Sequence, residues 1–181
     1  MKASSLERYL NNFGAKVVGE AKKSLRSQKG NTALEKTIRF KVEPTAQGFE
    51  TKFYMDDYGT YLDEGVSGTK VKRSFTDTKG ATRKSSYSYT TKGPPIDILS
   101  KWIKRKGIKP KGLGRGRSKN TGQYISGFAY LISRKIKRDG IKSLSFFQKP
   151  LGIEYTKLKK DILDILKLDI QNYITTFTKQ K

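Results

Sequence analysis

A central stretch with very few hydrophobic residues limits most strongly what this chain of 181 residues can fold into. Residues 66–93 contain almost no apolar side chains apart from Val66, Val71, Phe75 and Ala81, and they follow neither a helical nor a strand period. A segment of this length without periodicity predicts an extended arm or an insertion rather than part of a core. The run SSYSYTT within it could form a strand, with Tyr87 and Tyr89 on one side, which would make the arm a long hairpin. The core of a single domain over residues 1–181 is therefore expected to come from the two flanks.

The first flank predicts an amphipathic helix followed by a hairpin. Apolar residues recur at spacings of three and four from Leu6 to Ala21, and the helix is expected to end near Gly30. Apolar and polar residues then alternate in residues 37–42 (TIRFKV) and 49–55 (FETKFYM), which is the period of half-buried strands. The residues between these strands are expected to form the hairpin loop.

The second flank predicts helices separated by a basic loop. Pro94 and Pro95 favour the start of a helix that ends at Gly107. Residues 108–120 form a basic, glycine-rich loop, and apolar spacing predicts a helix over residues 124–138 and a C-terminal helix over residues 155–178. The fold class is therefore α+β: a small antiparallel sheet packed by an N-terminal helix and C-terminal helices, with long basic loops.

The chain contains neither cysteine nor histidine, which excludes several classes of chemistry. A disulfide framework, a thiolate nucleophile, the usual structural zinc site and the commonest general base are all absent. Catalysis by carboxylates with Mg²⁺, or by Lys and Tyr, stays open, but we expect no enzymatic activity, no cofactor and no metal site. No apolar run reaches the ~18–20 residues of a membrane span, and the N-terminal residues lack a signal-peptide hydrophobic region. We therefore expect a soluble protein made in the cytoplasm.

The chain is strongly basic, and the charge is uneven. It has 39 Lys and Arg residues against 16 Asp and Glu residues, a net charge of +23. Residues 70–119 have 16 basic residues against Asp77 and Asp97, a net charge of +14. Such a surplus predicts an acidic partner, which could be nucleic acid, a membrane surface or an acidic protein. The candidate residues for contact with a neighbouring subunit or with DNA are Lys70, Lys72, Arg73, Arg83, Lys84, Lys104, Arg105, Lys111, Arg115, Arg117 and Lys119.

Two motifs have a functional and a structural interpretation. Asp56, Asp57, Asp63 and Glu64 follow the predicted hairpin, and oxygen ligands of this kind can hold Mg²⁺ for phosphodiester chemistry. We favour a structural role, because turns favour Asp and short motifs often occur by chance.

The run GLGRGR, residues 112–117, resembles a phosphate-binding glycine loop, but it follows no predicted strand and lacks GxxxxGK[ST], so a flexible linker is favoured.

The order of these elements resembles the phage tail-completion and head–tail joining proteins of the lambdoid minor-tail-component family. A helix ending in AKKSL precedes TALEKTI and the first strand, and YGTYLDEG follows the second strand. The family has a tyrosine-rich motif at this place, Y-A-x-Y-x-E-x-G, which here reads Tyr58, Gly59, Tyr61, Glu64 and Gly65. Downstream, AYLISRKIKRDGIKSLSFF and a long terminal helix are similar to the family's helix, glycine turn and closing segment. The resemblance excludes roughly residues 66–93 and 108–120, which together with the helix PPIDILSKWIKRKGI indicate an enlarged relative.

The resemblance implies a structural virion protein without enzymatic activity, which forms a closed ring, six- or twelve-fold, in the phage neck between portal and tail. Its implied partners are further copies of itself, portal or adaptor proteins and tail proteins, with non-specific contact to packaged DNA and none to a membrane. The implied location is the virion, after assembly in the host cytoplasm. Two alternatives remain open: a non-specific nucleic-acid-binding protein, and a Mg²⁺-dependent nuclease that uses Asp57, Asp63 and Glu64.

Overall fold

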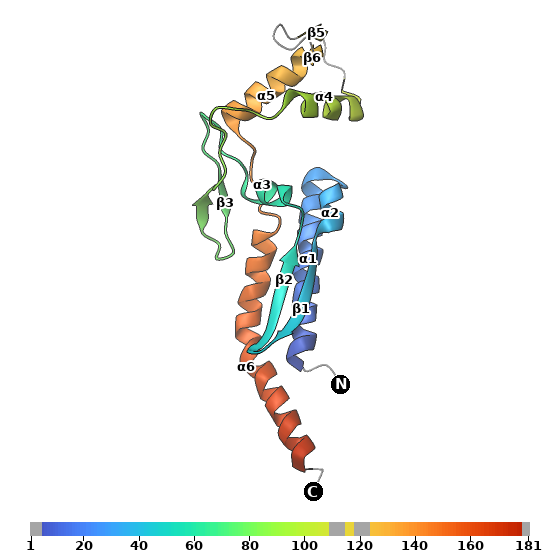
Figure 1. The fold of residues 1–181 in the computed structure, drawn as a ribbon. Helices are drawn as coiled ribbons and strands as arrows, with labels where there is room; N and C mark the ends of the chain where they lie inside the picture. Colours follow the sequence, from blue (N-terminus) through green and yellow to red (C-terminus); the bar gives the residue numbers. More distant parts are fainter. Residues whose placement is uncertain (1–4, 109–114, 118–123, 179–181) are drawn as a thin grey trace. The chain divides into compact units, whose positions relative to one another are not determined.

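The computed structural model describes residues 5–108, 115–117 and 124–178. Its elements confirm the α+β class, because helices accompany a small antiparallel hairpin (Figure 1). The chain groups into two compact units, whereas the sequence predicted one domain. Unit 1 comprises Met1–Asp63, Thr76–Thr82 and Leu144–Lys181, and unit 2 comprises Glu64–Phe75 and Arg83–Ser143. Each unit buries apolar side chains of its own.

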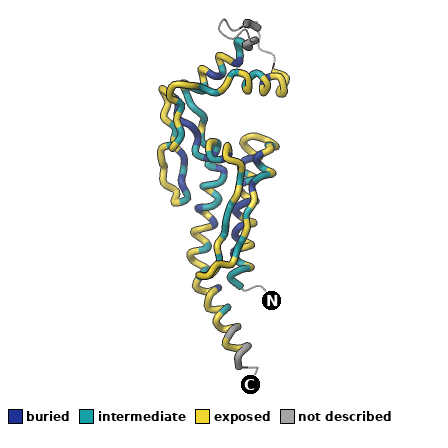
Figure 2. The backbone as a smooth tube through the Cα atoms, in the orientation of Figure 1, coloured by how far each residue is buried: buried dark blue, intermediate teal, exposed yellow. Residues whose placement is uncertain are grey.

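Unit 1 is built around two long helices and a hairpin. Its elements are α1 (Ser5–Lys29), α2 (Ala33–Thr37), β1 (Arg39–Thr45), β2 (Gly48–Tyr54), most of α3 (Tyr58–Glu64), and α6 (Gln148–Thr178). Helix α1 packs along α6 and against β1. The core consists of Val18, Ala21, Leu25, Leu34, Ile38 and Phe146. Figure 2 shows that buried residues follow α1, that the hairpin alternates between intermediate and exposed residues, and that the described C-terminal part of α6 is largely exposed.

A glycine in α1 allows the helix to approach the hairpin closely. A Cβ atom at Gly14 would overlap the ring of Phe40. Phe40 pairs across the hairpin with Phe53, whose ring centroid lies 6.1 Å from that of Phe13 and 5.4 Å from that of Phe147. The alternation seen in the sequence therefore places one face of the hairpin against both long helices, as predicted.

Unit 2 contains two packed helices and short strands. Its elements are β3 (Ser74–Thr76) and β4 (Thr82–Lys84), each shared with unit 1 by one residue, and α4 (Ile96–Arg105), β5 (Arg115–Arg117), β6 (Tyr124–Ser126) and α5 (Gly127–Asp139). Ile103 of α4 and Ala129 of α5 are buried. Ser133 of α5 donates a hydrogen bond through Oγ to the Pro94 carbonyl at 2.7 Å, which fastens the start of α4 to α5.

The stretch over residues 66–93, which was predicted as an arm or insertion, is fastened at its start to the end of α5. The Val66 N–H donates to the Ile141 carbonyl at 2.9 Å, and the Ile141 N–H donates to the Val66 carbonyl at 2.7 Å. Gly140 has φ 73°, and a Cβ atom there would overlap the Val66 carbonyl. The SSYSYTT run contributes one isolated bridge and no named strand.

Two helix starts differ from the predicted ones. The C-terminal helix begins at Gln148 rather than at residue 155, because Pro150 lies in the first turn, where a missing backbone N–H costs nothing. Helix α5 begins at Gly127, since residues 124–126 pair with β5 as a strand instead of starting the helix.

Candidate functional sites

The positive charge of the chain is concentrated in unit 2. By sequence, unit 2 has 20 Lys and Arg residues against Glu64, Asp97 and Asp139, a net charge of +17. Unit 1 has 19 Lys and Arg residues against 13 acidic ones, a net charge of +6, and the two values together account for +23. A field this one-sided attracts anionic ligands to unit 2.

A groove of about 830 Å³ lies beside α5 in unit 2, and we call it the α5 groove. Its walls come from α5 and from the loop segments that contain Thr69 and Gly93. None of the described residues that line it is acidic. Its five cations are Lys70, Arg134, Lys135, Lys137 and Arg138.

Backbone hydrogen bonds hold Lys70 against the last turn of α5. The Thr69 N–H donates to the Lys137 carbonyl at 2.9 Å, and the Lys70 N–H donates to the Arg138 carbonyl at 2.9 Å. These bonds satisfy carbonyl groups that the end of a helix otherwise leaves open. Gly68 permits the approach, because a Cβ atom there would overlap the Arg138 carbonyl. Backbone hydrogen bonds therefore fix Lys70 of the loop beside the cations of α5.

Two of the five groove cations have partners within the unit. Arg138 donates from Nε and Nη2 to the two carboxylate oxygens of Asp139, at 2.7 and 2.9 Å. These hydrogen bonds hold the pKa of Asp139 below its ordinary value, although partial burial opposes them and Lys135 adds to the effect. Lys137 donates from Nζ to the Thr91 carbonyl at 2.7 Å.

The other three groove cations form no ion pair with the described part of the chain. The Arg134 guanidinium lies 5.8 Å from the ring centroid of Tyr130, one helical turn earlier. The ammonium groups of Lys70 and Lys135 form no hydrogen bond or ion pair with the part of the chain that the structure describes. All three cations are exposed to solvent. The groove therefore offers three accessible cations beside an aromatic ring.

The cations predicted from the sequence are dispersed over unit 2. Lys70 lines the α5 groove, and half-buried Arg73 donates from Nε to the Asp139 carbonyl at 2.9 Å. Arg105 lines a separate groove between α4 and α5. Lys72, Arg83, Lys84 and Lys104 are exposed. For Arg115 and Arg117 the structure places the backbone in β5, and Lys111 and Lys119 lie outside the described residues.

The sequence analysis missed four of the five groove cations. Arg134, Lys135, Lys137 and Arg138 follow residues 70–119 and belong to the polar side of an amphipathic helix, which usually means a solvated face. The signal that could have found them is the run RKIKR, which has four cations in five residues and no acidic side chain. Their partner Lys70 could not be assigned to the same site, because the loop that brings it to α5 has no periodic pattern.

The tyrosine motif forms α3, which the sequence pattern did not predict as a helix. Tyr58 and Tyr61 are exposed on it, while Gly59 is buried and a Cβ atom there would lie 2.8 Å from the Met55 sulfur. Gly65 follows the helix with φ 76°, and a Cβ atom there would lie 2.7 Å from the Ile141 carbonyl oxygen. The two glycines therefore have packing roles, and the two tyrosines are available for contact.

Asp63 anchors the start of α6. Its Oδ1 accepts a hydrogen bond from the Phe147 N–H at 2.8 Å, and its Oδ2 accepts one from the Gln148 N–H at 3.2 Å. These are N–H groups that the first turn of a helix leaves without an internal partner. Among the described residues, no group of three or more acidic side chains is placed to hold a metal ion. The structural interpretation of Asp63 is therefore supported by its contacts.

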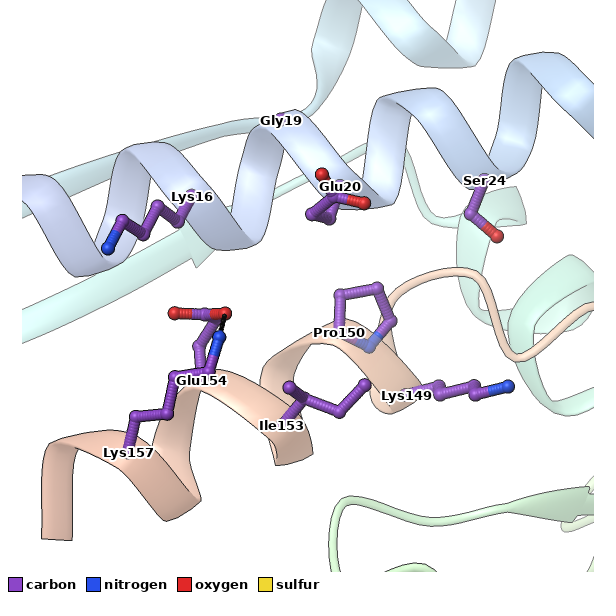
Figure 3. Close-up of a pocket in the computed structure, with 9 residues that line it drawn as sticks. All are labelled: Lys16, Gly19, Glu20, Ser24, Lys149, Pro150, Ile153, Glu154 and Lys157. Carbon is purple, nitrogen blue, oxygen red and sulfur yellow. Dashed lines mark hydrogen bonds and ion pairs between the residues drawn. The ribbon is translucent and has the colours of Figure 1, made fainter. Parts of the chain in front are cut away.

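Figure 3 shows a second groove, of about 680 Å³, between α1 and the first turns of α6 in unit 1. Its charged side chains are mixed: Lys16, Lys149 and Lys157 lie among Glu20 and Glu154. The Lys157 Nζ lies 2.5 Å from Oε1 of Glu154, a largely buried carboxylate that needs such a partner. The near balance of charge gives this groove little preference for either sign of ligand.

The distal segment of α6, residues 161–174, exposes apolar side chains. Leu163 is 67% and Ile170 is 59% exposed, and Leu166, Leu168 and Ile174 are exposed as well. The segment contains Asp161, Asp164 and Asp169 against Lys167, a net charge of −2 in a chain of +23. Contiguous exposed apolar surface of this kind marks a contact site. Apolar residues at helical spacing usually indicate core or a helix–helix interface, but Ile165 alone of the segment's aliphatic residues is buried.

An apolar groove of about 550 Å³ lies between α4 and α5 of unit 2. Its apolar lining residues are Ile98, Leu99, Trp102, Ile132 and Ile136, and Lys101 and Arg105 also line it. The apolar spacing of α4 favours a core position for Trp102, but the residue is 36% exposed and lines the groove. The groove therefore combines apolar surface with two cations.

Within the described ranges, no helix is both long enough and apolar enough to cross a bilayer. No protein-family model, curated protein or solved structure compared with this chain matches it.

Proposed function

We propose that this protein is a structural assembly subunit without enzymatic activity, and that it forms the ring that joins the head and the tail of a phage. The observation that carries the proposal is the distal segment of α6, where five large apolar side chains face solvent. Each square ångström of apolar surface that a neighbour covers stabilises the contact by roughly 25 cal/mol. An isolated chain exposes these side chains to water, whereas an assembled chain gains the stabilisation that comes from burying them.

A second copy of the chain is the occupant that charge favours. The distal segment is apolar with a net charge of −2, and the α4–α5 groove is apolar with two lysine or arginine side chains in a unit of net charge +17. Contact between the distal segment of one copy and the α4–α5 groove of the next uses different surfaces on the two copies. Contacts of this heterologous kind generate closed rings when the rotation closes.

The phage neck is the setting that the sequence resemblance implies. The helix, the hairpin, the tyrosine motif on α3 and the long terminal helix follow the order of the tail-completion and head–tail joining proteins that the sequence resembles. Exposed Tyr58 and Tyr61 are then available to portal, adaptor or tail proteins. Identification of the protein in purified virions by mass spectrometry tests this setting, and its absence from virions would contradict it.

Mass photometry and negative-stain electron microscopy of the purified full chain test the assembly itself. The wild type is expected to form closed oligomers, and the double variant Leu163→Ser/Ile170→Ser to shift the population to monomers. Ile153→Ser is the matched control, because Ile153 is an exposed apolar residue of the same helix outside the distal segment. A wild type that stays monomeric at all concentrations, or a control as disruptive as the double variant, would contradict the proposal.

A further inference from the structure

We propose that the α5 groove of unit 2 binds the phosphodiester backbone of a nucleic-acid strand. This inference goes beyond the assembly role, because it concerns one unit of one chain and needs no ring. It begins with charge: among the residues that the structure describes, five cations and no acidic side chain line the groove, and three of the cations form no ion pair. Each phosphate that such a cation neutralises releases counterions, which is the main source of affinity for nucleic acid.

The spacing of the donors suits successive phosphates. Arg134 and Arg138 are four residues apart on α5, which places them about 6 Å apart along the helix axis. Arg138 uses only Nε and Nη2 on Asp139, and a guanidinium has five N–H donors, so further donors remain. Lys70 and Lys135 add ammonium groups, which bind phosphates as point charges.

Tyr130 adds a flat surface at the same place. Its side chain is 46% exposed and lines the groove, with the Arg134 guanidinium over its ring. Positively charged grooves that track a nucleic-acid backbone commonly include aromatic rings on which bases stack, without a strict preference for sequence. The pairing of Tyr130 with Arg134 therefore favours an unpaired strand over a duplex.

The position of the charges favours nucleic acid over an acidic protein. Protein–protein interfaces are depleted of charged residues at their centre and place them at the rim. Interfaces with nucleic acid are more polar and much more positively charged throughout. The α5 groove follows the second arrangement, because its cations come from both walls, Lys70 from the loop and the other four from α5.

The groove is also held in place before any ligand binds. The hydrogen bonds from the Thr69 and Lys70 N–H groups to α5 carbonyls, and that from Lys137 Nζ to the Thr91 carbonyl, connect both walls. A preorganised site loses less conformational entropy on binding.

Fluorescence anisotropy with the full chain tests the proposal. The probes are a labelled single strand of about 20 nucleotides and a duplex of the same length, each titrated at several salt concentrations. The groove variant Lys70→Gln/Arg134→Gln/Lys135→Gln changes three exposed residues, and circular dichroism checks that it folds. Its control, Lys84→Gln/Lys104→Gln/Lys106→Gln, removes the same charge from exposed positions of the same unit outside both the α5 groove and the α4–α5 groove.

We expect the groove variant to bind the single strand at least about tenfold more weakly than wild type and to reduce the salt slope by about 2 to 3. The control variant should lose much less affinity for the single strand. A separate pair tests stacking: Tyr130→Ala should weaken single-strand binding several-fold, whereas Tyr155→Ala, which removes the matched ring beside Lys159 in unit 1, should not.

Three results would overturn the proposal. The first is no binding of either oligonucleotide at low salt. The second is an equal loss of affinity in the groove variant and in its charge-matched control, which would mean that the net charge of the unit attracts nucleic acid without a defined site. The third is a poly-glutamate peptide that binds at least as tightly as the single strand and is equally sensitive to the groove variant, which would assign the groove to an acidic protein.

Discussion

Asp169, near the end of α6, accepts a hydrogen bond through Oδ1 from the backbone N–H of Ser5, the first residue of α1, at 2.8 Å. Its Oδ2 accepts a second one, from the Leu6 N–H at 3.0 Å. Burial alone would raise the pKa of Asp169, but these hydrogen bonds and the charge of Arg8 lower it below its ordinary value. A side chain 164 residues away in sequence thus caps the first helix.

Removal of this cap should destabilise the protein. We expect Asp169→Ala to lower the free energy of unfolding by about 1 kcal/mol, within the range for lost helix caps, as measured by urea titration at neutral pH. Asp164→Ala is the control, because its carboxylate is exposed and, among the described residues, forms an ion pair with Lys167 alone, at 3.4 Å. The control should stay within about 0.5 kcal/mol of wild type, and an equal loss in both variants would rule out a special role for Asp169.

The same cap predicts a pH dependence. The pKa of Asp169 is lower in the folded chain than its ordinary value. The contribution of the cap to stability is therefore fully present above that ordinary value, near pH 4, and this contribution is lost as the pH falls through the folded pKa. The stability difference between wild type and Asp169→Ala should therefore shrink as the pH falls below about 4. A difference that stays constant through the acid range would show that the carboxylate charge is not involved.

Two glycines of α1 should respond to alanine in opposite ways. At Gly14 a Cβ atom overlaps the Phe40 ring, so Gly14→Ala should cost about 1–3 kcal/mol. At Gly19 a Cβ atom meets nothing within 4 Å, so Gly19→Ala should stabilise the helix by about 0.5–1 kcal/mol. Thermal denaturation of the two variants checks both signs, and the same sign in both would contradict the close approach of α1 to β1.

Asp63 should matter for folding and Asp57 should not. The Asp63 side chain is 2% exposed and holds the N–H groups of Phe147 and Gln148, so Asp63→Ala should cost about 1–3 kcal/mol because it leaves buried donors unpaired. Asp57 is exposed, and Asp57→Ala should fall within about 0.5 kcal/mol of wild type. If the two residues instead acted together as metal ligands, both variants would abolish Mg²⁺-dependent stabilisation, which differential scanning fluorimetry with and without Mg²⁺ would detect.

The hairpin contains a carboxylate that should titrate far below its usual range. Hydrogen bonds from Lys41 and Lys52, at 2.7 and 2.9 Å, lower the pKa of Glu43 to about 2. The side-chain carboxyl resonance of Glu43 should therefore show its midpoint near pH 2 in an NMR titration, and Lys52→Met should raise it. Because this pKa is depressed in the folded state, the pair stabilises the hairpin above pH 4–5 and its contribution is lost as pH falls toward 2. A midpoint near 4.5 would contradict the pairing.

Much of unit 1 could be predicted from the sequence, because its elements are strongly periodic. The spacing from Leu6 to Ala21 and the alternation through Phe40 and Phe53 depend on one buried face each, and the structure places those faces against each other. The contacts of Asp63 and Asp169 could not be predicted, since each joins residues far apart in sequence and neither has a local pattern.

The basic groove was the hardest feature to foresee. A sequence shows how many cations a segment holds, but the α5 groove depends on the loop that contains Lys70. This loop approaches the end of α5 closely, because Gly68 in the loop and Gly140 after the helix have no Cβ atom. The sequence concentrated attention on residues 70–119, whereas four of the five groove cations come from residues 134–138. Which cations lie close together in the folded chain, and not how many occur in one segment of the sequence, decides where a binding site for an anion forms.

The chain enters and leaves most of unit 2 through adjacent residues. The Leu144 N–H donates to the Leu62 carbonyl at 2.9 Å inside unit 1, and Val66 and Ile141 exchange hydrogen bonds inside unit 2. Most of unit 2 is thus inserted between Asp63 and Leu144 and has paired ends, although Thr76–Thr82 within that span belong to unit 1. Because of this segment, unit 2 is not a separable insertion: removal of residues 64–143 would also remove the part of unit 1 where Gly152 of α6 lets the Thr78 carbonyl approach the helix closely.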